Sequence, residues 1–514
     1  MKTDLLADRH IGIQEADLPA MLEKIGVKSL DELINKTIPS KIRLKEPLAL
    51  AAPMTEREFA EHIAGLASLN KIYTSYIGMG WYDTITPAVI QRNVFENPAW
   101  YTSYTPYQTE VSQGRLEALL NFQTVISDLT AMPLANCSLL DEATAAAEAA
   151  TMMYGLRSRD QQKKGTNVLF VDESIFPQNL AVIQTRVIPQ GMKIQVGNYK
   201  ELEFTPEIFA CIIQYPNASG SVEDYREFVE KAHAANCKVA VDADILSLAL
   251  LLPPGEWGAD IVFGSTQRLG IPLFYGGPSA AYFATRDEYK RNMPGRIIGL
   301  SKDKYGKICY RMALQTREQH IKREKATSNI CTAQALLATM AGFYAVYHGQ
   351  EGIKNIAKRI HSIATWLNKA LARLGYVQHN EIFFDTLRFS LPDHVSAQKL
   401  RTIALSKEVN LCYYDNGDVG FSIDETTDLK DVNLLLSIFS IAAEETMQEV
   451  TDIPEASSLN RDLRRRTSFL THEVFNKYHT ETEMMRYIKR LERKDISLAH
   501  SMISLGSCTM KLNA

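Results

Sequence analysis

The sequence predicts an α/β protein with a large, mostly parallel sheet domain, followed along the chain by a smaller α+β domain. From about residue 71 to 345, short apolar runs of strand type alternate with helical segments, which is the pattern of a parallel sheet covered by helices. Beyond residue 345, one long helical segment is followed by strand-like runs and an Asn-Gly pair. The length of 514 residues also exceeds one compact core and favours two or three domains.

The first two parts of the chain are predicted to be a helical arm over residues 1–70 and the large domain over 71–345. Helical periodicity in the arm covers Leu18–Ile25, Ser29–Ile34 and Thr55–Ser68. The strand-like runs of the large domain are Val168–Val171, Cys211–Gln214, Val239–Val241, Ile261–Phe263 and Ala280–Phe283, and Val222–Ala235 is helical. A parallel sheet of this kind places its ligand chemistry at the carboxyl ends of the strands.

The small α+β domain is predicted over residues 346–448. Its elements are a helix at Gly352–Leu374, a strand at Ile382–Phe389, a hairpin with a type I′ turn at Asn416-Gly417 and a helix at Leu429–Glu445. Residues 449–514 are expected to hold a connector, in which Arg464–Arg466 form a solvated face, and then the start of another segment.

Composition narrows the class of protein. Hydrophobic residues at 46% and charged residues at 23% are typical of globular proteins. A net charge of -4 gives no electrostatic case for nucleic acid or an acidic membrane surface. The richest apolar run, Ile245–Leu252, is too short to span a bilayer. Seven cysteines without metal-like spacing suggest reduced thiols in the cytoplasm, and His10 and His320 have no second ligand at metal-site spacing.

Several motifs occur along the whole chain in a fixed order. They are Arg9–Gly12, the string YTPYQTEVSQGRLE over Tyr104–Glu117, Ser138–Glu142, Pro253–Gly258, Gly276–Pro278, Leu314–His320, Ala326–Cys331, Phe469–His472 and Tyr478–Glu483. Together they resemble the amino-terminal half of glycine decarboxylase, the P-protein family of the glycine cleavage system. The resemblance implies an aspartate-aminotransferase-like fold, the pyridoxal 5'-phosphate (PLP)-dependent transferase fold type I.

The same resemblance implies a reaction and its partners. Family members use PLP to decarboxylate glycine and pass the aminomethyl group to the lipoyl arm of the H-protein, with the cofactor as electron sink. Their two halves pack as a homodimer or pseudo-dimer, and the active site lies at the interface. No nucleic acid or membrane partner is expected.

The residue that would hold the cofactor is replaced in this chain. PLP enzymes need a lysine that forms a Schiff base, and the family supplies it in a His-Lys pair before an Ile-Pro and a Gly-rich turn. Here Gln267-Arg268 stands at that place, ahead of Ile271-Pro272. A guanidinium stays protonated and is not nucleophilic. We therefore expect PLP to be bound by a lysine-bearing partner half, and this chain to be inactive alone.

The helix that would hold the phosphate also argues against a cofactor. Asp141 and Glu142 stand in its first turn, where carboxylates oppose an anion, and Ser138 with Asp141 resembles a capping box. Asp242 ends a predicted strand, at the place of the family's pyridine-binding acid, and Asp244 lies two residues further on. Without the lysine, their expected role is hydrogen bonding at the strand end.

Residues that line a shared active site are predicted from the resemblance. They are Thr316, Arg317, Ser328 and Asn329, followed by Tyr104, Thr105 and Tyr107. Arg317 suits a carboxylate or phosphate, although a solvated helix face is an equal interpretation of residues 317–323. The aromatic stretch Tyr73–Tyr107 is expected to face the missing half, with Thr316–Asn329 beside it.

Residues Leu505–Ala514 resemble the opening of the family's catalytic half, so the chain is expected to be the front of a longer polypeptide. Cys508 would then belong to the partner's active site, and a free surface thiol is the alternative. For the whole chain, the rival functions are a non-catalytic scaffold or regulatory subunit of PLP fold, and an independent PLP enzyme using another lysine.

Overall fold

The structure is a computed structural model that describes residues 12–102, 106, 108–274, 276–314, 319–326, 328 and 333–501. The chain divides into two compact units, residues 1–73 and 74–514. The first unit holds helices α2 (Leu18–Ile25), α3 (Leu30–Thr37) and α4 (Glu56–Ala67), which confirms the three predicted helices. Local caps set two of these starts: Ser29 accepts a hydrogen bond from Glu32 N–H, and Thr55 forms a capping box with Glu58.

The second unit is built around a seven-stranded sheet with the order β2-β8-β7-β6-β5-β3-β4. Its strands are β2 (Leu134–Ala135), β3 (Val168–Asp172), β4 (Lys193–Gly197), β5 (Ile208–Tyr215), β6 (Lys238–Ala243), β7 (Ile261–Ser265) and β8 (Ala281–Thr285). Strands β4, β3, β5, β6 and β7 run parallel, whereas β8 is antiparallel to both β7 and β2. The predicted parallel sheet is confirmed; β4 was missed because most of its side chains lie outside the core.

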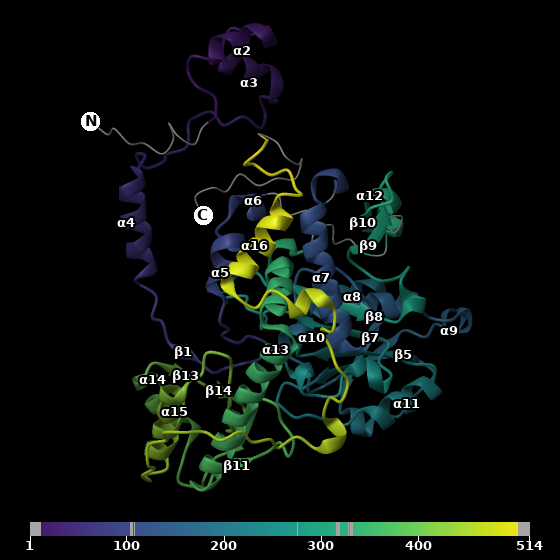
Figure 1. Ribbon diagram of the computed structural model, residues 1–514, viewed down its shortest axis with the longest axis vertical. Coiled ribbons are helices and arrows are strands. Elements are labelled where there is room, and N and C mark those ends of the chain that lie inside the picture. The colour runs from purple at the N-terminus through teal and green to yellow at the C-terminus, as the bar shows by residue number, and fades with distance from the viewer. Residues whose placement is uncertain are drawn as a thin grey trace. The chain divides into compact units, whose positions relative to one another are not determined.

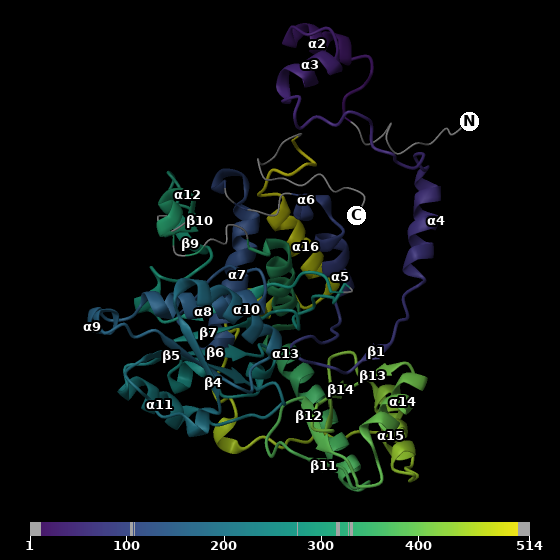
Figure 2. The same cartoon turned by 180° about the vertical axis from the view of Figure 1, so that it is seen from behind.

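Helices cover both faces of this sheet, as predicted (Figures 1 and 2). One face packs on α8 (Glu142–Gly155) and α10 (Pro177–Val187), and the other packs on α7 (Gln113–Thr130), α11 (Arg226–Ala234) and α13 (Ala335–Ala372). Successive residues of β3 alternate between the two cores: Phe170 belongs to one and Leu169 with Val171 to the other. The strands are therefore buried on both faces, which explains their continuous apolar sequences.

Helix α8 begins at Glu142, one residue after Asp141, and its cap differs from the prediction. Asp141 itself is the N-cap and accepts a hydrogen bond from Thr144 N–H at 2.7 Å. Ser138 lies outside the helix with a φ of 114°, so the predicted Ser138–Asp141 capping box is wrong.

A four-stranded antiparallel sheet with the order β11-β12-β15-β14 follows. Its elements are β11 (Val377–Gln378), β12 (Thr386–Ser390), β14 (Cys412–Tyr413), β15 (Val419–Ser422), α14 (Ala397–Ser406) and α15 (Leu429–Ala442). The predicted helix from Gly352 is the second part of α13, whose backbone breaks at Gly349 with φ 62° and ψ -174°. The predicted hairpin exists, but Gly417 has a positive φ and Asn416 does not, so the type I′ turn is wrong.

The last described residues return to the larger sheet region, where α16 (Glu481–Glu492) packs against α7. Arg465 anchors this return, because its guanidinium donates to the carbonyls of Leu129, Leu248 and Asp128. The predicted solvated face is therefore wrong for Arg465. Burial lowers the pKa of Arg465 to about 10. The groups that bind its guanidinium are carbonyl oxygens, and no carboxylate of the described residues is bonded directly to it to offset this effect of burial.

Candidate functional site

The Gln267-Arg268 pair lies in the loop after β7, at the carboxyl edge of the parallel strands. The Arg268 side chain is buried, with 5% of its surface exposed. It points into the space between the seven-stranded and the four-stranded sheet. This is the edge where a doubly wound sheet places its ligands.

Two carboxylates from different sheets hold the Arg268 guanidinium. Its Nη1 donates to Asp244 Oδ2 at 2.8 Å, just beyond β6, and also to Asp385 Oδ2, just before β12. Burial opposes the charge of Arg268, but Asp244 and Asp385 outweigh it and raise the pKa of this arginine above its usual range. The guanidinium carbon also lies 3.9 Å from the centroid of the Tyr82 ring. Arg268 therefore links the two sheets by ion pairs and stacking.

The segment 74–86, which we call the strap, passes between these same two sheets. Gln267 Nε2 donates to the Tyr82 carbonyl at 2.7 Å, and Tyr82 N–H donates back to Gln267 Oε1 at 3.2 Å. On the other side, Thr84 Oγ1 and Ile85 N–H donate to the Glu425 carboxylate at 2.6 and 2.9 Å. The strap is thus hydrogen-bonded to both sheets.

Glycine at position 78 permits the close approach of the strap to β15. Gly78 has a φ of 69°, and a Cβ placed there would overlap the Ser422 side chain. Ser422 N–H donates to the Tyr76 carbonyl at 2.9 Å in the same region.

The carboxyl groups of Glu142 and Asp242 face each other in the same region as Arg268. Asp242 is 1% exposed and accepts a hydrogen bond from Asn179 Nδ2 at 2.7 Å, while its Oδ1 is buried without a partner. Burial raises the pKa of Glu142 to about 7 and that of Asp242 well above its ordinary value. A protonated Glu142 can donate a hydrogen bond to the Asp242 carboxylate, so the pair is expected to share a proton near neutral pH. Asp242 and Asp244 both make hydrogen bonds at the strand end, as predicted.

The cavity that remains among these groups is very small. It measures about 30 Å³ and is lined by Gly80, Tyr82, Glu142, Phe176, Gln214, Pro216, Asn217, Asp242, Ala243, Asp244, Ser265, Arg268, Asp385 and Thr386. A space of that size holds one or two water molecules. With no lysine, no room for a pyridine ring and a carboxyl group at the start of α8, these residues do not fit PLP. We call this region the closed cavity.

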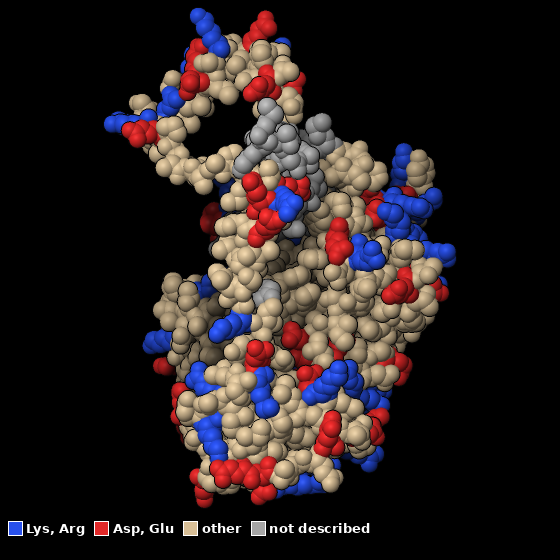
Figure 3. Space-filling model, turned by 90° about the vertical axis from the view of Figure 1, so that its left-hand side faces the viewer, with Lys and Arg blue, Asp and Glu red and all other residues tan. Residues whose placement is uncertain are grey.

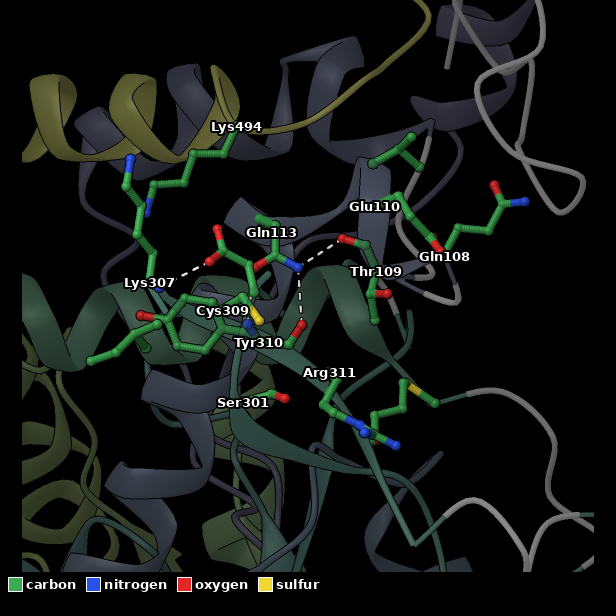
Figure 4. A pocket seen from close by; sticks show the side chains of 14 residues that line it. Gln108, Thr109, Glu110, Gln113, Ser301, Lys307, Cys309, Tyr310, Arg311 and Lys494 are labelled. Carbon is green, nitrogen blue, oxygen red and sulfur yellow. Dashed lines mark hydrogen bonds between the residues drawn. The ribbon is translucent and has the colours of Figure 1, made fainter. Parts of the chain in front are cut away.

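A second, open region lies at the amino end of α7. A groove of about 1170 Å³ separates η2 (Thr109–Val111) and the start of α7 from the hairpin formed by β9 (Ile297–Lys302) and β10 (Ile308–Ala313) (Figure 4). Gln113 spans it by donating to the carbonyls of Thr109 and Tyr310 at 2.7 and 2.9 Å. Its lining includes cationic Lys307, Arg311 and Lys494. We call it the hairpin groove.

Of the eight residues predicted to line the shared site, Ser328 lies within the described part of the chain. Tyr104, Thr105, Tyr107, Thr316, Arg317, Asn329 and Cys508 lie outside the described residues, as does His10. Ser328 is described and half-buried, and its side chain bonds the Glu148 carboxylate. Burial raises the pKa of Glu148, and the bonds from Arg186 and Ser328 partly offset that rise. Among the described residues, no His, Cys, Asp or Glu side chains are grouped as a metal site.

The aromatic stretch behaves differently from the prediction. Tyr82 and Trp100 are buried within this chain, and Phe95 stacks on Phe274 at 5.0 Å. Their rings serve the protein's own core, so the prediction that they face a missing half is wrong for them. Among the rings of this stretch that the structure describes, Trp81 is exposed, with 41% of its surface accessible.

Sequence reasoning missed three carboxylates beside the four-stranded sheet: Asp385, which lines the closed cavity, and Asp424 and Glu425, which accept hydrogen bonds from the strap. Asp385 lies 117 residues from its partner Arg268. No pattern of neighbouring residues identifies the two members of such a pair. The sequence does offer one signal, which is a single aspartate beside an apolar strand.

Comparisons with known proteins place the chain among its relatives. Residues 8–439 match the family described as glycine cleavage system P-protein. The chain is 79% identical over 514 residues to glycine dehydrogenase (decarboxylating) from Bacteroides thetaiotaomicron and 57% identical to that from Flavobacterium johnsoniae. It spans about half the length of these curated relatives, 54% of each.

Solved structures confirm the fold class. A crystal structure of glycine decarboxylase (P-protein) of the glycine cleavage system, in inhibitor-bound form, matches with a TM-score of 0.76 and 30% identity over 84% of this chain and 99% of that chain. A sphingosine-1-phosphate lyase from Burkholderia pseudomallei matches with a TM-score of 0.53 at 12% identity, which concerns the fold alone. The chain has the PLP-dependent transferase fold type I. None of its described helices combines the length and apolar character needed to cross a bilayer.

Proposed function

Because this chain belongs to the glycine cleavage system P-protein family, we propose that it is the half of a glycine decarboxylase that does not hold the cofactor. The proposed enzyme decarboxylates glycine with PLP and transfers the aminomethyl group to the lipoyl arm of the H-protein. PLP, bound by the lysine-bearing second half, supplies the electron sink. The proposed setting is the cytoplasm, as a homodimer or pseudo-dimer.

The observation that carries this proposal is the state of Arg268. A cation at the lysine position is held by Asp244 and Asp385 and is packed against Tyr82. Replacing it by lysine would give a more compact cation with different hydrogen-bond geometry, and the cavity would still lack room for a cofactor. The closed cavity therefore supports a structural rather than a catalytic role for this loop.

In this proposal the chain contributes surface rather than chemistry. Tyr104, Thr105, Tyr107, Thr316, Arg317, Ser328 and Asn329 would line the partner's active site, and Cys508 would belong to it. Their proposed role there is to bind and orient the substrate and to exclude water from the site. Domain limits at residues 70, 345 and 448 remain predictions.

The test compares this chain alone with the pair. Incubated with PLP, the chain alone should show no visible absorbance band of a lysine-bound cofactor, and with glycine no exchange of carbon dioxide. Coexpression with the part of the Bacteroides thetaiotaomicron relative that this chain does not cover should produce both.

Borohydride trapping extends the test to Arg268→Lys. Because the cavity stays closed and Glu142 stays in place, this variant alone should trap no cofactor. Trapped PLP on any lysine of the wild-type chain would overturn the proposal and favour an independent PLP enzyme. A stable pair without glycine chemistry would favour the scaffold or regulatory subunit.

A further inference from the structure

The β9–β10 hairpin carries an apolar stripe that starts in the core and continues onto exposed surface. The pairs Ile298↔Met312, Leu300↔Tyr310 and Lys302↔Ile308 follow one another on the same face of the ribbon. Ile298 and Met312 are buried, at 3% and 2% exposure, whereas Leu300 and Ile308 are 65% and 69% exposed. Tyr305 in the turn is 75% exposed. The face that is core at its base is therefore uncovered at its tip.

This tip is held in a fixed shape. Asp303 closes the turn by accepting hydrogen bonds from Tyr305 N–H at 2.8 Å and Lys307 N–H at 2.9 Å. Gly306 takes a φ of 79°, and its N–H donates to the Asp303 carbonyl at 3.0 Å. A preorganised surface loses little conformational entropy on association.

Helix α7 fixes the hairpin against the rest of the molecule. Gln113 exchanges two hydrogen bonds with the backbone of Tyr310, both at 2.9 Å, in the manner of a neighbouring strand. Gln123 does the same for Ile298, at 2.7 and 3.2 Å. Gln123 therefore holds the base of the ribbon and Gln113 holds its middle, opposite Leu300, so that α7 fixes the hairpin at two positions beside the hairpin groove.

Charge surrounds the exposed apolar residues. Over residues 297–313 there are four cations and one acid: Lys302, Lys304, Lys307 and Arg311 against Asp303. The Lys304 ammonium lies 4.9 Å from the Tyr305 ring centroid. An apolar centre with a cationic rim fits a partner surface that is apolar in the middle and bordered by carboxylates.

We infer that the hairpin tip, with Leu300, Tyr305 and Ile308, docks onto the second half of the glycine decarboxylase. The inference rests on the proposed function. The curated relatives contain 46% of their length (100 minus 54) beyond what this chain covers, and that part is the occupant to which we commit. Obligate interfaces bury more than about 2,000 Å² and are apolar at their centre. The tip and the hairpin groove beside it would supply one part of such a centre.

The experiment uses the full chain and the uncovered part of the Bacteroides thetaiotaomicron relative, purified separately or together. The test variant is Leu300→Ser/Ile308→Ser. The matched control is Ile188→Ser/Val377→Ser, because Ile188 and Val377 are 58% and 64% exposed but lie away from the hairpin. Association is measured by titration calorimetry and by light scattering after size exclusion. Thermal unfolding checks that each variant is folded.

We expect the hairpin variant to bind the second half at least 10-fold more weakly, while the control binds as the wild type does. Lys304→Glu should weaken binding less and make it less dependent on low salt. Equal binding by wild type and hairpin variant would overturn the inference. So would a wild type that binds only itself and loses that self-association in the hairpin variant.

The two proposals fail in different ways. If the pair forms through the hairpin but shows no PLP band and no glycine chemistry, the docking inference stands and the proposed function falls. If the pair is active and the hairpin variant binds normally, the function stands and the docking inference falls.

Discussion

The closed cavity and the β9–β10 hairpin differ in where they keep their polar and apolar groups. In the closed cavity, one cation and several carboxyl groups lie mostly out of solvent and are bonded to each other or to neighbouring N–H groups. On the hairpin, apolar side chains are exposed and cations surround them. Over the face seen in Figure 3, by contrast, acidic and basic side chains are interspersed.

The difference indicates that the two regions are under different constraints. Replacing one member of a buried ion pair destabilises the fold strongly, because the other charge is then left unpaired. Exposed apolar side chains contribute little to the folding stability of this chain, and they stabilise an association when a partner covers them. Substitutions in the closed cavity should therefore alter folding, and substitutions on the hairpin should alter association.

The largest effect is expected for Arg268→Met. It leaves the buried Asp385 and the partly exposed Asp244 without their shared cation, which should cost about 3–5 kcal/mol of unfolding free energy. Chemical denaturation measures it. The control is Arg226→Met, whose ion pair with Asp224 is exposed and should be worth less than about 1 kcal/mol. Equal losses in both variants would contradict a stabilising role for the buried ion pairs.

The next effect concerns pH and Glu142→Gln. The folded-state pKa of Glu142, about 7, lies above the ordinary value of 4.5, so its protonated form stabilises the fold below pH 4.5. That stability is lost as pH rises to 7, by about 1–3 kcal/mol in all.

A glutamine at position 142 keeps a donor for Asp242 and does not titrate. The variant should therefore gain stability relative to the wild type between pH 5 and pH 8, as measured by thermal unfolding. Glu173→Gln, at an exposed position, is the control. A difference between wild type and Glu142→Gln that is independent of pH would argue against the shared proton.

A smaller effect is expected for Gly78→Ala in the strap. The added Cβ meets Ser422 as well as an unfavourable φ, so the loss should be more than about 1 kcal/mol. Gly165 has nearly the same φ, 70°, with open space around it. The excess loss at position 78 over Gly165→Ala isolates the contact between strap and small sheet, and identical losses would mean that only φ matters.

The smallest effect on folding is expected for Leu300→Ser/Ile308→Ser. Because both side chains are mostly exposed, the unfolding free energy should change by less than about 0.5 kcal/mol per site. Thermal unfolding of the isolated chain measures it. A large loss would show that the tip serves this chain's own core, and the contrast with the closed cavity would disappear.

The sequence by itself determined the features that depend on neighbours along the chain. Apolar runs predicted five of the seven strands of the larger sheet, namely four parallel strands and the antiparallel β8, and helical periodicity predicted α2, α3 and α4. The replacement of lysine by Arg268 could also be read directly, because the nucleophile either is present or is not. These features are local: a cap bonds three residues ahead, and a strand is buried along its whole length.

Only the tertiary structure decided what surrounds those residues. It brought Asp385 to Arg268 and Glu425 to the strap, and it buried Tyr82 and Trp100 in this chain's own core. It also placed the guanidinium of the half-buried Arg465 against three carbonyl groups. It also left Leu300 and Ile308 exposed on a face whose base is buried. Contacts between residues far apart in sequence follow from how sheets pack, and the side-chain pattern of one strand does not record which surface will cover it.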